Sequence, residues 1–232
     1  MTGGLQSTVA GRIPGAAALG LLVPPSVPLL PATLLADPAW TAQVIGDRSR
    51  RTADRRVPAT VWWYSVSAVL VTPVLAGLVT GVPLSGRLAD TSLAFRPDGL
   101  PIAAVSAARG DDVAADLRET LAAVVTAVAD AGRMRERPLW AIATDSIANR
   151  LLALGRARGD VHGATSLAAP LATAIGAPLP MPRYVDVAGA RFTRRASCCL
   201  LDEVPHEPRC TSCPRRPPAE RQILLEDAAA RL

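Results

Sequence analysis

The sequence contains no lysine and few aromatic residues. All 25 basic residues are arginines, and Phe, Trp and Tyr together make up 3% of the 232 residues. With so few large rings, the core has to be built from Ala, Val and Leu, a composition that favours packed helices over a β-sandwich. Hydrophobic residues reach 50% and charged residues 19%, so the chain is predicted to fold and not to be disordered.

Groups that serve acid–base or phosphate chemistry are scarce. There are two histidines, His162 and His206, and no phosphate loop or dinucleotide fingerprint. The sequence therefore predicts no nicotinamide or flavin site. The net charge is +5, but it comes without the basic helix or the aromatic stacking platform that nucleic-acid binding needs. We attribute the arginines to GC-rich coding and predict no nucleic-acid partner.

One uncharged stretch, from Val57 to Gly86, is long enough to cross a bilayer, and it follows a basic run between Arg48 and Arg56. Prolines interrupt this stretch, and its longest proline-free segment, 59–72, has the length of a buried core helix. We predict a core helix for this stretch. A membrane span and a peripheral membrane contact at residues 57–86 stay open as alternatives.

Apolar periodicity elsewhere predicts a mainly α-helical (α+β) fold with small β-hairpins. Two hairpins are predicted, one around Pro97-Asp98-Gly99 and one around Ala188-Gly189. We expect a mainly helical domain over residues 1–190 and a C-terminal cysteine-containing segment, 191–232, packed on it. Helices are predicted at 38–45, 111–131, 138–154, 161–175 (bent at Pro170) and 218–232.

All four cysteines lie within sixteen residues, in the order Cys198, Cys199, ten residues, Cys210, two residues, Cys213. The N-terminus lacks the basic segment of a signal peptide, so a cytoplasmic location is predicted, where disulfides are disfavoured. A single zinc ion would have to bind adjacent cysteines, whose side chains diverge. A [2Fe-2S] cluster is wider and needs four thiolates, two on each iron. The residues alone leave zinc, an iron–sulfur cluster and a Cys210–Cys213 redox pair open.

The stretch "RRASCCLLDEVPHEPRCTSCP" resembles the C-terminal signature of the ferric-siderophore reductase family, FhuF-like proteins with a Cys-Cys-x10-Cys-x2-Cys [2Fe-2S] site. Upstream, "PLWAIATDSIANRLLALG" is similar to a Leu-Trp-containing helix of that family. The resemblance implies one-electron reduction of the iron in a ferric siderophore, which releases iron in the cytoplasm. It also implies that a [2Fe-2S] cluster is held by Cys198, Cys199, Cys210 and Cys213.

Electron transfer agrees with the scarcity of acid–base groups. Hard oxygen donors hold Fe(III) far more strongly than Fe(II), so one electron is enough to release the metal. Because no nicotinamide or flavin site is predicted, the electron has to come from an unidentified donor. His206, in the ten-residue loop, is predicted to be an exposed loop residue and not a ligand.

Arginines outnumber acids around the cysteines, by eight to five between Met181 and Arg221. We predict that they neutralise the cluster and raise its potential. The alternative is that some attract an anionic siderophore or an acidic donor protein. The residues named for either role are Arg194, Arg195, Arg209 and Arg215.

Two rival functions stay open. The first is a non-enzymatic binding module stapled by zinc on the four cysteines. The second is an iron or redox sensor that carries the cluster but has no substrate. We likewise leave open whether the aromatic group Trp62, Trp63 and Tyr64 packs in the core or faces a bound siderophore.

Overall fold

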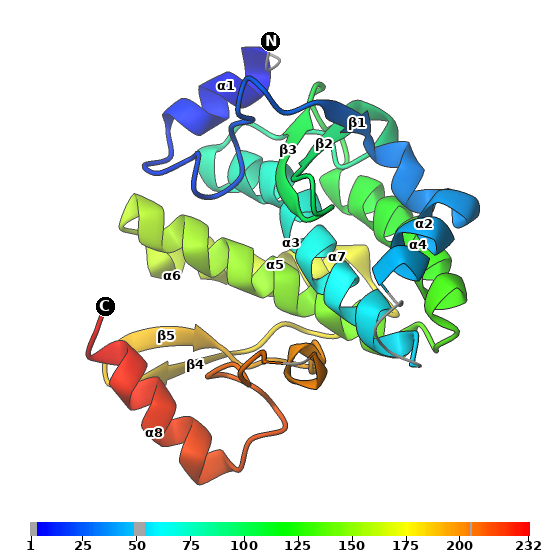
Figure 1. Cartoon of the computed structure of the whole chain (residues 1–232). Helices are drawn as coiled ribbons and strands as arrows, with labels where there is room; N and C mark the ends of the chain where they lie inside the picture. The colour runs from blue at the N-terminus through cyan, green and yellow to red at the C-terminus, as the bar shows by residue number, and fades with distance from the viewer. Residues whose placement is uncertain (1–3, 49–53, 205) are drawn as a thin grey trace.

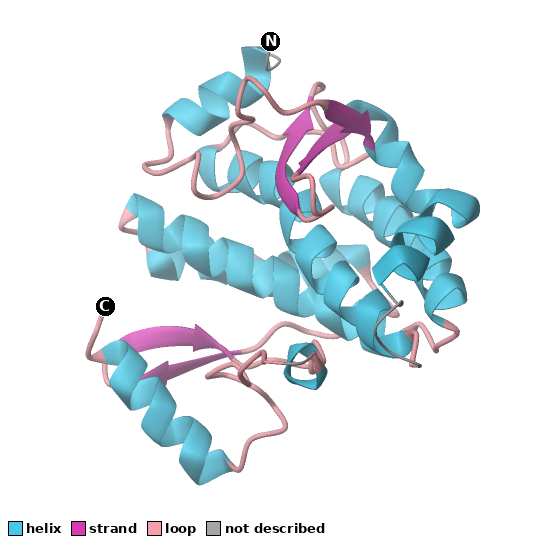
Figure 2. Cartoon of the chain, in the orientation of Figure 1, coloured by secondary structure: helices cyan, strands magenta, loops and turns pink. Residues whose placement is uncertain are grey.

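The computed structural model describes residues 4–48, 54–204 and 206–232, so residues 49–53 of the basic run lie outside the described part. The predicted mainly α fold is confirmed, with strands confined to two small antiparallel sheets (Figure 2). The strands are β1 (Leu29–Pro31), β2 (Thr91–Phe95), β3 (Pro101–Ser106), β4 (Tyr184–Val187) and β5 (Ala190–Thr193). The helices are α1 (Gly4–Gly11), α2 (Pro38–Arg48), α3 (Arg56–Thr80), α4 (Val113–Gly132), α5 (Arg137–Arg158), α6 (Val161–Ser166), α7 (Ala168–Ile175) and α8 (Pro218–Ala229).

Two layers are visible in Figure 1. A helical body holds α1 to α7 and the sheet β1-β2-β3, whereas β4, β5, the cysteine segment and α8 lie together beneath α5. Both predicted hairpins are present, and each turns on a glycine with a positive φ, 75° at Gly99 and 79° at Gly189. The predicted division at residue 190 is spanned by the β4–β5 hairpin and stays a prediction.

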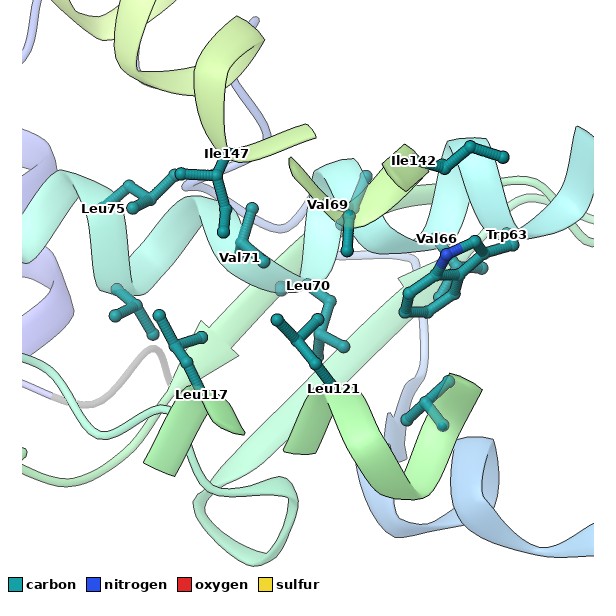
Figure 3. Packing of buried hydrophobic residues seen from close by; sticks show 14 of the residues in the cluster. Trp63, Val66, Val69, Leu70, Val71, Leu75, Leu117, Leu121, Ile142 and Ile147 are labelled. Atoms are coloured by element: carbon teal, nitrogen blue, oxygen red, sulfur yellow. The ribbon is translucent and has the colours of Figure 1, made fainter. Parts of the chain in front are cut away.

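The core lies where α3, α4 and α5 meet. Figure 3 shows the apolar side chains of these three helices interlocking, among them Leu70, Leu121 and Ile147. Trp62 and Trp63 are fully buried in the same cluster, and the indole N–H of Trp63 donates to the carbonyl of Leu139 at 2.8 Å. These two tryptophans are therefore core residues, and only Tyr64 of the aromatic group is turned toward the cysteine segment.

The uncharged stretch forms α3, which continues through Pro73 to Thr80 and is longer than the proline spacing predicted. Pro73 removes one backbone hydrogen bond, but close packing of α4, α5 and β3 around α3 holds the helix together. Among the described helices, α3 alone is long and apolar enough to cross a membrane, and 67% of its most apolar window is buried inside the protein. The burial identifies α3 as a core helix.

The structure corrects two details. The predicted helix 161–175 is interrupted at Leu167, not bent at Pro170, so that α6 and α7 are separate. Pro170 would clash with the carbonyl of Ser166 in a continuous helix, which explains a break one turn earlier. The first sheet also has a third strand, β1, which pairs with β2 from a proline-rich stretch whose short length hid it.

Two helical glycines provide a matched test of packing around α3. A Cβ on Gly77 would lie 2.6 Å from the backbone oxygen of Val82, whereas a Cβ on Gly46 in α2 would meet nothing within 4 Å. We expect Gly77→Ala to lower the free energy of unfolding by about 1–3 kcal/mol because backbone has to move. Gly46→Ala should raise it by about 0.5–1 kcal/mol. Equal effects of the two substitutions in denaturant titrations would contradict the packing described for α3.

Candidate functional site

The cysteine segment leaves β5 at Thr193 and makes two tight turns. Leu200, directly after Cys199, has a left-handed conformation with φ of 59°, and the chain then enters a 3-10 turn, Leu201–Glu203. In the second turn the backbone N–H of Cys213 donates to the carbonyl of Cys210 at 3.2 Å. Cys199 and Cys213 are buried at 3% and 1% exposure, whereas Cys198 and Cys210 are half-buried.

The four sulfurs lie as two pairs. Sγ of Cys198 is 3.8 Å from Sγ of Cys213. The other pair is bridged by one nitrogen, because Nη1 of Arg195 donates to Sγ of Cys210 at 3.2 Å and to Sγ of Cys199 at 3.6 Å. Each pair therefore combines one cysteine of the adjacent Cys198-Cys199 with one of the later two. Among the described residues, no three His, Cys, Asp or Glu side chains are gathered closely enough to ligate one ion.

Arg195 is the centre of a buried polar network. Its side chain is 2% exposed, as is that of Asp145 on α5, and the two form an ion pair with Nε to Oδ2 at 3.4 Å. Asp145 also accepts backbone N–H groups of Ala196 at 2.7 Å and Ser197 at 3.2 Å. The guanidinium lies over the ring of Tyr64 on α3, 4.9 Å from its centroid. The network therefore attaches the cysteine segment to the two central helices.

Burial controls the protonation of these groups. It raises the pKa of Cys198 to about 11, and it also raises the pKa of Cys210, where the nearby Arg195 acts in the opposite direction. Burial likewise raises the pKa of Asp145, against the hydrogen bonds that it accepts. Burial acts to lower the pKa of Arg195, but the charges of Cys199 and of the other neighbours of Arg195 outweigh burial. The pKa of Arg195 is therefore raised, and the guanidinium stays protonated. Metal binding at these sulfurs therefore has to displace thiol protons.

The remaining predicted arginines differ from Arg195. Arg209 donates to Asp202 at 2.8 Å, and Arg215 donates to Glu203 at 2.7 Å, with Asp202 3.6 Å away. These ion pairs hold both guanidinium groups against the ten-residue loop. Arg215 also lies close to the thiol of Cys198, and the hydrogen bond to Glu203 acts with Cys198 and Asp202 to raise the pKa of Arg215. Arg194 is exposed at the end of β5, and His206 is exposed in the loop, as expected.

Sequence reasoning did not single out Asp145. It lies fifty residues before Arg195 in the sequence, on a helix that was predicted from its apolar stripe alone. The available signal was the single carboxylate of this helix, placed among apolar residues in its middle, since such a group is seldom buried without a partner.

The arrangement fits a cluster with thiolate ligands. Two thiolates bound to one tetrahedral metal with bonds of about 2.3 Å lie about 3.8 Å apart, which is the Cys198–Cys213 separation. Nη2 of Arg195 is buried without any acceptor among the described residues, although an unpaired buried donor is costly. A sulfur-rich anionic group between the two pairs would supply acceptors for it.

Comparison with known families supports this chemistry. Residues 195–215 match the model of the FhuF 2Fe-2S C-terminal domain, which confirms the resemblance noted from the cysteine spacing. No curated protein matches the chain. The chain is thus an iron–sulfur protein with an FhuF-type C-terminal domain, and its cofactor is a [2Fe-2S] cluster.

Proposed function

We propose that this iron–sulfur protein reduces Fe(III) in a ferric siderophore to Fe(II) and so releases iron in the cytoplasm. The cluster would be held by Cys198, Cys199, Cys210 and Cys213. When bound, a [2Fe-2S] cluster carries one electron at a time, and one electron is what the conversion of Fe(III) to Fe(II) requires. The electron is supplied by a one-electron donor that the sequence does not name.

The observation that carries the proposal is the position of Arg195. A buried, permanently protonated guanidinium donates to two of the four sulfurs, Cys199 and Cys210. Its positive charge and its N–H groups stabilise the more negative, reduced state of a thiolate-bound centre, and this raises the potential.

Other residues exclude water and hold the frame. The ion pair with Asp145 and the ring of Tyr64 keep the guanidinium in place without a water shell. The loop pairs Asp202–Arg209 and Glu203–Arg215 close the segment on its outer side. No proton transfer to the substrate is needed in a one-electron step, which agrees with the exposed position of His206.

The proposal is tested on protein that is purified without air. We expect equal iron and acid-labile sulfide contents and a brown colour that dithionite bleaches. In a stopped-flow mixing experiment, the reduced protein should regain its colour much faster with a ferric siderophore than with buffer, while an Fe(II) chelator reports the released iron.

Other outcomes assign the rival functions. Zinc without sulfide would replace the proposal with a zinc-stapled binding module. A cluster that is reoxidised no faster by any ferric siderophore than by buffer would point to an iron or redox sensor instead.

A further inference from the structure

A cavity of about 430 Å³ lies next to the cysteine segment, between the β4–β5 hairpin, α8 and α5. Ser212 and Pro214, which flank Cys213, form one part of its wall. Arg194, Arg195 and Ala196, which lead to Cys198, form another. The volume is within the range of small-molecule sites. A molecule in this cavity would therefore be separated from the cysteine sulfurs by little more than a layer of protein atoms.

The wall of this cavity carries positive charge only. Arginines 183, 194, 195 and 221 line it, and no carboxylate does so among the described residues. Arg195 is committed to Asp145 and the sulfurs, and Arg221 makes only long contacts of 3.4 Å to backbone carbonyls. In the described part of the chain, the guanidinium groups of Arg183 and Arg194 have neither a hydrogen-bond acceptor nor an acidic partner.

A second feature also indicates a missing acceptor. Thr193, another wall residue, is 5% exposed, and its hydroxyl has no hydrogen-bond partner among the described residues. Buried hydroxyl groups are nearly always paired, so an unpaired one deserves a ligand, a water or an ion. Unpaired guanidinium groups that line one cavity are the donors of an anion site.

A second cavity, of about 750 Å³, has Cys198 in its wall but a different charge pattern. Its lining includes Asp130 and Glu203 as well as Arg56, Arg133 and Arg135, so the acids offset two of its three bases. Glu203 is in turn paired with Arg215. The smaller cavity is therefore the more strongly cationic of the two.

We infer that the cavity of Arg183, Arg194 and Thr193 binds the substrate, and that the substrate is a negatively charged ferric chelate. This inference rests on the proposed reductase function. Catecholate and hydroxycarboxylate donors leave the Fe(III) complex with net negative charge, whereas three singly deprotonated hydroxamates leave it neutral. Unpaired arginines in the cavity wall attract the negatively charged complexes, whereas they have no electrostatic attraction for the neutral trihydroxamate complexes. Catecholate and hydroxycarboxylate chelates are thus preferred over trihydroxamates.

The inference is tested with gallium, because Ga(III) complexes keep the charge and shape of the Fe(III) complexes but accept no electron. The probes are the Ga(III) complexes of a tris-catecholate and of a trihydroxamate siderophore, added to the oxidised protein with its cluster in a calorimeter. The variants are Arg183→Gln/Arg194→Gln and, as the control, Arg109→Gln. Arg109 is exposed, has no charged partner among the described residues, and lines neither of the two cavities.

We expect the dissociation constant of the gallium tris-catecholate to rise at least about tenfold in the double variant, since two charge contacts are lost. Binding to the wild type should weaken as salt is added. Arg109→Gln should bind as the wild type does, and all variants should keep the visible spectrum of the cluster. The trihydroxamate should bind more weakly than the tris-catecholate and should respond to none of the substitutions.

Unchanged tris-catecholate binding in the double variant would overturn the inference, as would a trihydroxamate that binds as tightly. If the binding inference fails in this way but iron chelates still reoxidise the reduced wild-type protein, the proposed reductase function stands. Conversely, if the arginines are needed for gallium tris-catecholate but no iron chelate reoxidises the cluster, the anion site stands and the reductase function fails.

Discussion

Replacing Cys213 with serine is expected to abolish the visible absorption of the cluster and the reductase activity together. Cys213 is the most deeply buried of the four cysteines, at 1% exposure, and its Sγ lies 3.8 Å from that of Cys198. A serine hydroxyl is a poor ligand for iron in a thiolate site and holds its proton far more tightly than a thiol does. One iron should therefore be left with a single cysteine ligand, and iron and sulfide contents should fall to near background.

The control for this substitution is Ser197→Ala. The hydroxyl of Ser197 makes only a weak contact of 3.4 Å to the carbonyl of Cys198, whereas its backbone N–H holds Asp145 and is kept in the variant. We expect Ser197→Ala to retain its cluster and its rate. If Cys213→Ser retains a wild-type spectrum, Cys213 is not a ligand. If it loses the spectrum but still reduces ferric siderophore, the cluster is not the electron carrier.

Arg195→Gln is expected to have two separable effects. The loss of the donor to Cys199 and Cys210 should make the cluster potential more negative, on the order of 50 mV, since 59 mV corresponds to a tenfold change for one electron. The loss of the partner of Asp145, whose side chain is 2% exposed, should lower the free energy of unfolding by about 3–5 kcal/mol. A spectroelectrochemical titration measures the first effect and denaturant unfolding of the cluster-loaded protein the second.

The double variant Arg195→Gln/Asp145→Asn separates these effects. Removing the carboxylate charge should restore part of the stability that Arg195→Gln loses, because no unpaired buried charge remains. The restoration is not full, because Asn offers one acceptor oxygen where Asp145 accepts two backbone N–H groups on separate oxygens. The potential should stay negative, because the donor to the sulfurs is still missing. A potential that returns to the wild-type value in the double variant would show that Arg195 acts only through the packing of the segment.

Much of the fold could be predicted from local signals. The helix now assigned to Val113–Gly132 was visible in its apolar spacing, with Asp112 as its N-cap through a hydrogen bond to the N–H of Ala115. Both hairpins were visible in their turn residues. The prediction missed strand β1 because a three-residue strand depends on what packs against it. It placed the effect of Pro170 at the proline itself, whereas the break lies one turn earlier, at Leu167.

The sequence by itself located the candidate ligands, because the four cysteines and their spacing lie in a single stretch between Cys198 and Cys213. The residues alone left zinc, an iron–sulfur cluster and a redox pair open, and the resemblance of this stretch to the FhuF-like signature favoured the [2Fe-2S] cluster. Only the tertiary structure decided which arginine is buried against the sulfurs. Arg209 and Arg215 have acids within their own loop and pair with them, whereas Arg195 finds Asp145 and Tyr64 on two distant helices. The physical reason is that a buried charge needs partners from every side, and these come from segments far apart in the chain.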